Sequence, residues 1–237
     1  MAHGKKYREA VSRYDKQTPY PAAQAVELVK TLSSVKFDES VDVVFNLGID
    51  PKKADQLVRG TVSLPHGTGK DVRVAVFTSG DKEAEAKEAG ADLVGGSELV
   101  EALQGGRELD FDVAIATPDM MAEVGKLGKI LGPRGLMPNP KAGTVTQDVG
   151  KAVAEFKAGR LEYRNDRYGN VHIPVGKVSF SVEQLVQNLA SISGEITRAR
   201  PAASKGRYMK SMTLSSTMGP GVKIDMNTIE DLIEAAG

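Results

Sequence analysis

The alternation of short apolar runs with helical segments between residues 68 and 159 constrains the fold more than any other feature. Residues 72–77 and 113–116 are near-continuous apolar runs, which are typical of strands buried on both faces of a sheet. Residues 92–94 form a third short run of the same kind. Strands that alternate with helices build right-handed parallel βαβ units. We therefore predict a Rossmann-like βαβ domain of three layers over residues 68–159.

Helix start signals define the segments between these strands. Ser97 is a residue type that accepts hydrogen bonds from free backbone N–H groups, so we expect it to cap a helix at 98–104. Asp119 is expected to cap a helix at 120–131 in the same way. The remaining helices predicted here lie at 81–88 and from about 149 to 159.

The segments on either side of this domain follow a different pattern. Apolar and polar side chains alternate along residues 41–47 and again along 208–217, as in half-buried strands. Residues 161–164 and 171–175 flank a polar turn with Gly169, which predicts a β-hairpin. An isolated hairpin is marginal in water, so we expect these strands to form one sheet. Amphipathic helices at 21–34 and 182–199 would cover it.

The predicted fold class is α/β with two domains. A discontinuous α+β domain is built from both termini, residues 1–67 plus 160–237, and residues 68–159 are inserted into it. Three tandem units remain the alternative interpretation of the same pattern.

Several classes of protein are disfavoured by what the sequence lacks. There is no Cys, which excludes disulfides and thiolate zinc sites and fits a reducing compartment. No apolar run approaches the ~18 residues of a membrane helix. The stretch Gly67-Thr-Gly-Lys70 lacks the first Gly and the final Ser/Thr of a phosphate-binding loop, because Leu64 and Asp71 stand there. We expect no enzyme activity, no cofactor, no metal, no small-molecule substrate and no membrane association.

Residues 126–145 are the least ordinary stretch of the chain. They contain four Gly, three Pro and no acidic residue, so they form a shaped loop and not a regular element. A loop of this length inside a domain usually serves a function. Its four cations are Lys126, Lys129, Arg134 and Lys141.

A ladder of hydroxyl groups marks the strand predicted at 208–217. Period-two alternation places Ser211, Thr213, Ser215 and Thr217 on one face, where hydroxyls can bond phosphates and ribose 2′-OH groups. Residues 160–224 carry ten Lys and Arg against four Asp and Glu although the whole chain is neutral, which favours a polyanionic partner. A solvent-facing strand would show the same hydroxyl pattern. The pair Asp38-Glu39 is interpreted as a solvated turn or a cap.

The combination of motifs resembles the L-one family of bacterial large-subunit ribosomal proteins. The stretches that carry the resemblance span nearly the whole chain in order: Lys36-Phe-Asp-Glu39, Leu47-Gly-Ile-Asp-Pro51, Arg59-Gly-Thr-Val-Ser-Leu-Pro-His-Gly67, residues 126–145, Tyr163-Arg-Asn-Asp166 and Ser216-Thr-Met-Gly-Pro220.

The resemblance implies a structural protein that binds large-subunit rRNA and forms the mobile stalk beside the tRNA exit site, where it assists release of deacylated tRNA. It also implies a translational repressor that binds its own operon mRNA. We expect a monomer when free and a cytoplasmic location on the ribosome. The alternative functions are a nucleotide-binding enzyme centred on the βαβ domain and a scaffold that binds only proteins.

The resemblance places the RNA surface on the terminal domain. The residues it implies are Glu27, Lys36, Phe37, Ser40, Arg164, Arg167, His172, Thr213, Ser215, Thr217, Met218 and Gly219. The cations of residues 126–145 would instead face the other domain or tRNA.

Overall fold

The computed structural model describes residues 4–80, 82–106 and 108–234. The chain divides into two compact units, Met1–Gly69 with Glu162–Gly237, and Lys70–Leu161. We call these the terminal unit and the inserted unit. The expected boundaries at 67/68 and 159/160 fall close to these limits, and the independence of the two units as domains stays a prediction.

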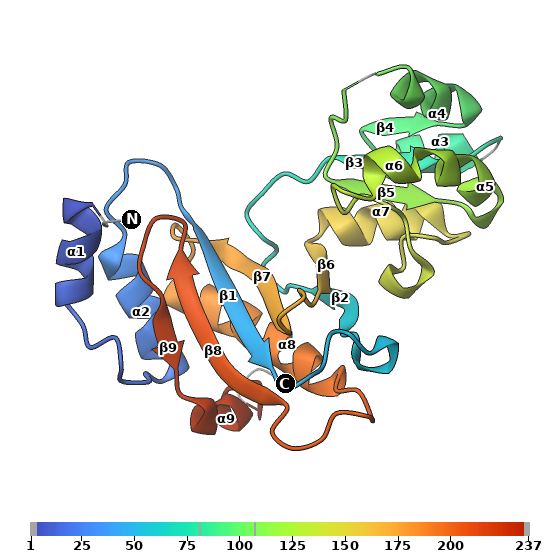
Figure 1. The fold of residues 1–237 in the computed structure, drawn as a ribbon. Helices are drawn as coiled ribbons and strands as arrows, with labels where there is room; N and C mark the ends of the chain where they lie inside the picture. The colour runs from blue at the N-terminus through green and yellow to red at the C-terminus, as the bar shows by residue number, and fades with distance from the viewer. Residues whose placement is uncertain (1–3, 81, 107, 235–237) are drawn as a thin grey trace. The chain divides into compact units, whose positions relative to one another are not determined.

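A four-stranded antiparallel sheet organises the terminal unit (Figure 1). Its strands are β1 (Ser40–Leu47), β7 (Asn170–Lys177), β8 (Met209–Ser216) and β9 (Val222–Ile224), in the order β7-β1-β8-β9. Strand β1 alternates between buried and half-buried residues along its whole length, which confirms the period-two prediction. The two central strands therefore have one apolar face and one polar face.

Two helices cover the apolar face of this sheet, as predicted (Figure 1). They are α2 (Ala22–Leu32) and α8 (Val182–Arg198). Helix α8 begins with a capping box, in which the Ser181 hydroxyl accepts from the Gln184 N–H and the Gln184 side chain accepts from the Ser181 N–H. Such a cap satisfies two backbone donors that the first helical turn leaves free. The other helices of this unit are α1 (Lys5–Ser12), η1 (Ala54–Gln56), η5 (Met226–Thr228) and α9 (Ile229–Glu234).

The predicted hairpin over 161–175 is wrong. Strand β6 (Arg160–Arg164) pairs with β2 (Arg59–Ser63) in a separate two-stranded sheet, whereas β7 pairs with β1. A single bridge between Asn165 and Val171 connects the two segments. Turn residues reveal where the chain reverses but not which distant strand completes the pairing, and β2 lies about a hundred residues earlier.

The inserted unit has three layers, as expected for a βαβ arrangement. Its parallel sheet has the order β4-β3-β5, with β3 (Val74–Phe77), β4 (Leu93–Gly95) and β5 (Val113–Ala116). Ala75 and Phe77 pack on one side with helices α4 to α6, and Val74 and Val76 pack on the other with α3 and α7. The helices are α3 (Lys82–Glu88), α4 (Ser97–Gln104), α5 (Met121–Val124), α6 (Gly128–Leu131) and α7 (Val149–Lys157), with 3-10 turns η2 (Pro118–Met120), η3 (Gly125–Leu127) and η4 (Pro140–Ala142).

Two predicted helix caps are not formed. Ser97 is the first residue of α4, and Gly96 takes the capping position without any side-chain bond. Asp119 lies inside η2, which begins after Thr117. The single helix predicted over 120–131 is broken into α5, η3 and α6, with Gly125 and Gly128 at the junctions. Glycine disfavours a helix interior because it loses more backbone entropy than other residues.

Among the described residues, no helix has both the length and the apolar character needed to cross a membrane.

Candidate nucleic-acid interface

The polar face of the four-stranded sheet, here called the open face, is formed by residues of all four strands. Val44 of β1 lies between His172 of β7 and Thr213 of β8, and Thr213 pairs in turn with Lys223 of β9. Two further rows lie beside this one, Pro174–Asp42–Ser215 and Asn170–Asn46–Ser211. The predicted positions His172, Thr213 and Ser215 therefore lie on one surface. Ser211 belongs to it as well, although the family resemblance had not marked it.

One end of this face is formed by two segments far apart in the sequence. The Ser40 N–H donates to Thr217 Oγ1 over 3.1 Å, and the Thr217 N–H donates to the Ser40 carbonyl oxygen over 3.1 Å. Met218 and Gly219 follow directly. We call Ser40 and Thr217–Gly219 the hydroxyl rim. All four of its residues were predicted, and the structure brings them together.

A buried carboxylate holds the hydroxyl rim in place. Glu39 is only 1% exposed. Its Oε1 accepts from the Met218 N–H over 2.7 Å, and its Oε2 accepts from the Ser33 hydroxyl at the end of α2. The interpretation of Asp38-Glu39 as a solvated turn is therefore wrong for Glu39. A buried charge must be satisfied by hydrogen bonds, and these bonds connect α2 to the loop after β8.

Two large apolar side chains, one in the rim and one just before Ser40 in the chain, are exposed to solvent. Phe37 is 55% exposed and Met218 is 61% exposed. The segment that carries Phe37 is anchored, because the Asp38 carboxylate accepts from both the N–H and the hydroxyl of Ser179. The Asp38 side chain is therefore hydrogen-bonded within the protein, whereas the Phe37 and Met218 side chains are exposed to solvent. Exposed aromatic and apolar groups beside hydrogen-bonding groups are the surfaces on which RNA bases stack.

Glycine is required at position 219 because a neighbouring side chain lies very close to the backbone, and not because of its φ angle. A Cβ at this position would stand 2.4 Å from the Ser216 hydroxyl. Ser216 is buried, and its hydroxyl has no hydrogen-bond partner in the described part of the chain. Any side chain at position 219 would therefore displace either Ser216 or the rim.

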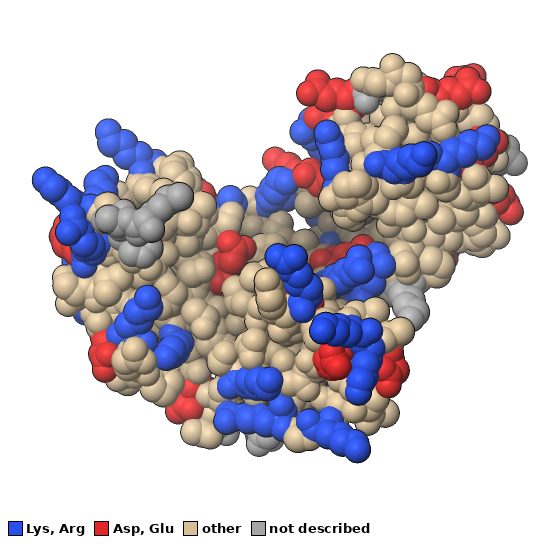
Figure 2. Space-filling view, in the orientation of Figure 1, with Lys and Arg blue, Asp and Glu red and all other residues tan. Residues whose placement is uncertain are grey.

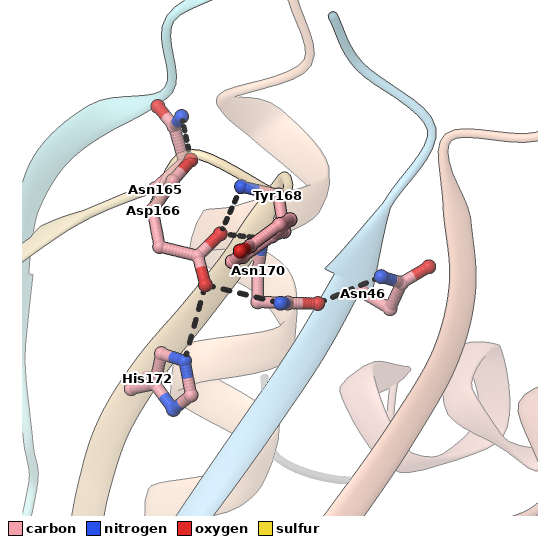
Figure 3. A network of polar contacts seen from close by, with 6 residues as sticks. All are labelled: Asn46, Asn165, Asp166, Tyr168, Asn170 and His172. Carbon is pink, nitrogen blue, oxygen red and sulfur yellow. Dashed lines mark hydrogen bonds and ion pairs between the residues drawn. The ribbon is translucent and has the colours of Figure 1, made fainter. Parts of the chain in front are cut away.

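The opposite end of the open face is ordered by Asp166 (Figure 3). Its Oδ1 accepts from the N–H groups of Tyr168 and Asn170, each over 2.8 Å, and its Oδ2 lies 3.7 Å from His172 Nε2. The Asn170 amide bonds both Asp166 Oδ2 and the Asn46 side chain, which connects this turn to β1. Burial opposes ionisation of Asp166, but the hydrogen bonds from Asn170 and Tyr168 outweigh it and lower its pKa below the ordinary value.

Asp42 is the one acidic side chain of the open face. Burial raises its pKa, and the nearby charges of His172 and Lys177 act in the opposite direction. A carboxylate on this face repels phosphate, so Asp42 opposes any anionic ligand bound there.

The other predicted RNA residues lie outside these contacts. Lys36 is exposed before Phe37, and Arg164 is exposed at the end of β6. Arg167 is exposed and lies 5.1 Å from the centre of the Tyr168 ring. Glu27 is exposed on α2, and its carbonyl oxygen accepts from the Thr31 hydroxyl. The structure therefore groups Ser40, His172, Thr213, Ser215 and Thr217–Gly219 on the open face and its rim, and Phe37 is exposed three residues before Ser40.

The cations of residues 126–145 belong to the inserted unit. Lys126, Lys129 and Arg134 are exposed and form no ion pair with a described residue. The side chain of Lys141 lies outside the described part of the structure. The end of this loop is fixed to the sheet by a bridge between Ala116 and Val145. Across the described residues, no group of three or more His, Asp or Glu is arranged to hold a metal ion.

Comparison with known proteins identifies relatives of this chain. Residues 28–220 match the model of the ribosomal protein L1p/L10e family. The chain is 56% identical to the large ribosomal subunit protein uL1 of Nocardioides sp., covering 96% of this chain and 94% of the relative. It is 56% identical to uL1 of Salinispora tropica (99% and 98% covered) and 54% identical to uL1 of Solidesulfovibrio magneticus (98% and 98% covered).

Proposed function

Because the chain belongs to the ribosomal protein L1p/L10e family, we propose that it binds large-subunit rRNA through the hydroxyl rim and the open face of its terminal unit. As a member of this family it is a structural, non-enzymatic component of the large ribosomal subunit and is located on the ribosome.

The hydroxyl rim is the observation that carries the proposal. Ser40 and Thr217 are bonded to each other, and the buried Glu39 fixes Met218. A preorganised site loses less entropy when it binds than a mobile one. Hydroxyl and backbone groups recognise the 2′-OH groups and shape of folded RNA, and Phe37 and Met218 supply apolar surface for exposed bases.

The finer roles follow from the same site and the resemblance. Bound to rRNA, the protein forms the mobile stalk beside the tRNA exit site, and its inserted unit assists release of deacylated tRNA through the cations of residues 126–145. A copy of the same RNA fold in its own operon mRNA would occupy the same rim, so that excess protein represses its own synthesis.

The alternative of a nucleotide-using enzyme is set aside because the family is a structural, non-enzymatic one. A scaffold that binds only proteins is separated from the proposal by filter binding to rRNA.

Two substitutions test the proposal directly. Met218→Asp places a negative charge on the rim, and Thr217→Val removes the hydroxyl bonded to the Ser40 N–H. We expect Met218→Asp to weaken rRNA binding by at least about 30-fold, the effect of losing a central contact. Thr217→Val should weaken it less. Filter binding over a salt series measures both, and affinity should fall as salt rises because bound phosphates release counterions.

Ala122→Asp is the matched control. Ala122 is exposed on α5 of the inserted unit, so this variant introduces a negative charge in the other unit. Its rRNA affinity should equal that of the wild-type chain. Equal affinities of Met218→Asp and Ala122→Asp would refute the assignment of the rim.

A further inference from the structure

We propose that the end of the terminal unit opposite the hydroxyl rim is a second RNA-binding surface, which stacks a base on Tyr168 and binds phosphates in a basic hollow. This inference rests on the proposed function and extends it to residues outside the predicted set. The basic hollow is defined by four cations, Lys53, Lys205, Arg207 and Lys210, which line a pocket of about 510 Å³.

The basic hollow holds more positive charge than the protein neutralises. All four cations are exposed, and none forms an ion pair with a described residue. The only acidic residue of the lining is Asp50. Lys and Arg side chains gather at this end of the unit, over the start of β8 and the loop before it (Figure 2). Clustered cations that form no ion pair with a described residue favour an anionic ligand.

The backbone around the basic hollow is held firmly. The Gly48 N–H donates to the Tyr208 carbonyl oxygen over 2.6 Å, and Arg207 Nε donates to the Met209 carbonyl oxygen over 3.1 Å. The Asp50 N–H donates to Gln56 Oε1 over 2.8 Å. The cations therefore project from a fixed frame, which is what recognition of successive phosphates requires.

Tyr168 adds an aromatic surface to the same end. It is 69% exposed, the largest exposed fraction among the big apolar side chains of the described residues, and the Arg167 guanidinium lies 5.1 Å from its ring centre. The Asp166 carboxylate fixes this turn by accepting the N–H groups of Tyr168 and Asn170 (Figure 3). A tyrosine held in place beside an arginine presents flat groups on which an unpaired base can stack.

The turn and the basic hollow are neighbours. A Cβ on Gly169 would lie 3.2 Å from the Leu47 carbonyl oxygen and 3.3 Å from the Ile49 side chain. Ile49 and Gly48 line the basic hollow. The aromatic turn and the cations therefore lie at the same end of the sheet, where β1 ends and β7 and β8 begin. RNA fits both features at once because it combines phosphates with stackable bases.

Two variants of the full chain test the second surface separately from the first. The triple variant Lys53→Gln/Lys205→Gln/Lys210→Gln removes three charges and leaves Arg207, which bonds the backbone. Its control, Lys126→Gln/Lys129→Gln/Arg134→Gln, removes three charges from the inserted unit. The slope of log affinity for rRNA against log salt should fall by about three in the first variant, one for each phosphate contact, and stay unchanged in the control.

Tyr168→Ala should weaken rRNA binding by about 5- to 100-fold, the range for one stacked base. Tyr168→Phe keeps the ring and should bind as the wild-type chain does. Wild-type affinity and salt slope in both Tyr168→Ala and the triple variant would overturn the inference, as would an equal effect of the control triple. In that case, loss of binding by Met218→Asp in the same assay would still support the hydroxyl rim as an RNA-binding site. If the wild-type chain itself did not bind rRNA, both proposals would be overturned.

Discussion

The hydroxyl rim of the terminal unit and the loop of residues 126–145 in the inserted unit are two different kinds of candidate surface for an anion. The loop carries exposed cations, glycines and prolines. The rim contains no cation and is built from hydroxyl and backbone groups held by a buried carboxylate. By charge alone, the loop would be the RNA site.

The difference shows why a count of charges is a poor guide to a folded-RNA interface. Exposed cations attract any polyanion and are screened by salt. Fixed donors, acceptors and apolar side chains recognise one shape. We therefore expect the rim to determine which RNA is bound, and the cations to add affinity that depends on salt.

Among variants of Glu39, Asp42 and the loop, removal of the Glu39 side chain should have the largest effect. Glu39→Ala leaves the Met218 N–H and the Ser33 hydroxyl without their partner. The loss of such buried bonds costs about 1–3 kcal/mol of stability, and rRNA affinity should fall about tenfold as the rim loosens. Thermal unfolding and filter binding measure the two effects.

Glu39→Gln serves as the control because an amide can still bond both groups. This variant should regain most of the affinity lost in Glu39→Ala. If Glu39→Ala bound rRNA as the wild-type chain does, the rim would not need its buried anchor.

Replacement of Asp42 tests the open face with a smaller expected effect. Burial raises the pKa of Asp42, so the fold favours the protonated, neutral carboxyl. This stabilising contribution is fully present below the unfolded pKa of ~4, and it is lost as pH rises through the folded pKa and the buried group becomes charged. Asp42→Asn should therefore be more stable than the wild-type chain at pH 7, and this advantage should disappear in acid. Loss of one repulsive charge should raise rRNA affinity about two- to fivefold.

Melting temperatures at neutral and acidic pH give the stability comparison, and filter binding at neutral pH gives the affinity. A variant that is less stable than the wild-type chain at pH 7 would show that the Asp42 carboxylate is favourable in the fold.

The smallest effect on rRNA binding is expected from the loop. Replacing Lys126, Lys129, Arg134 and Lys141 together by Ala should change affinity for isolated rRNA by less than about twofold, because sites without shared partners act independently. The same variant should slow release of deacylated tRNA from ribosomes. Collapse of rRNA binding in a folded variant would instead make the loop the main contact.

Much of the fold could be predicted because burial imposes strong periodicity. Strand β1 alternates because one face packs on helices, and β5 is apolar throughout because both faces are covered. The pairing of β6 with β2 could not be predicted, since nothing local distinguishes it from a hairpin. The caps at Ser97 and Asp119 failed because their neighbours, Gly96 and Thr117, take those positions.

The candidate site was predictable to a similar degree. The hydroxyls of β8 follow from the same alternation, whereas the rim joins residues 177 positions apart and needed the family resemblance. Glu39 was missed because an acid in a short polar connection usually faces water. Tyr168 was missed as well, although an aromatic side chain in a polar turn is a signal that could have marked it.

The sheet of the terminal unit has a consequence for the order of events during synthesis. Strand β1 is hydrogen-bonded on both edges by β7 and β8, which follow it in the chain. At about 5–20 residues per second, Thr217 is made roughly 9 to 35 s after its partner Ser40. A chain that ends before Thr217 has no rim. If the protein represses its own messenger through this surface, only chains that contain the whole rim could act as the repressor.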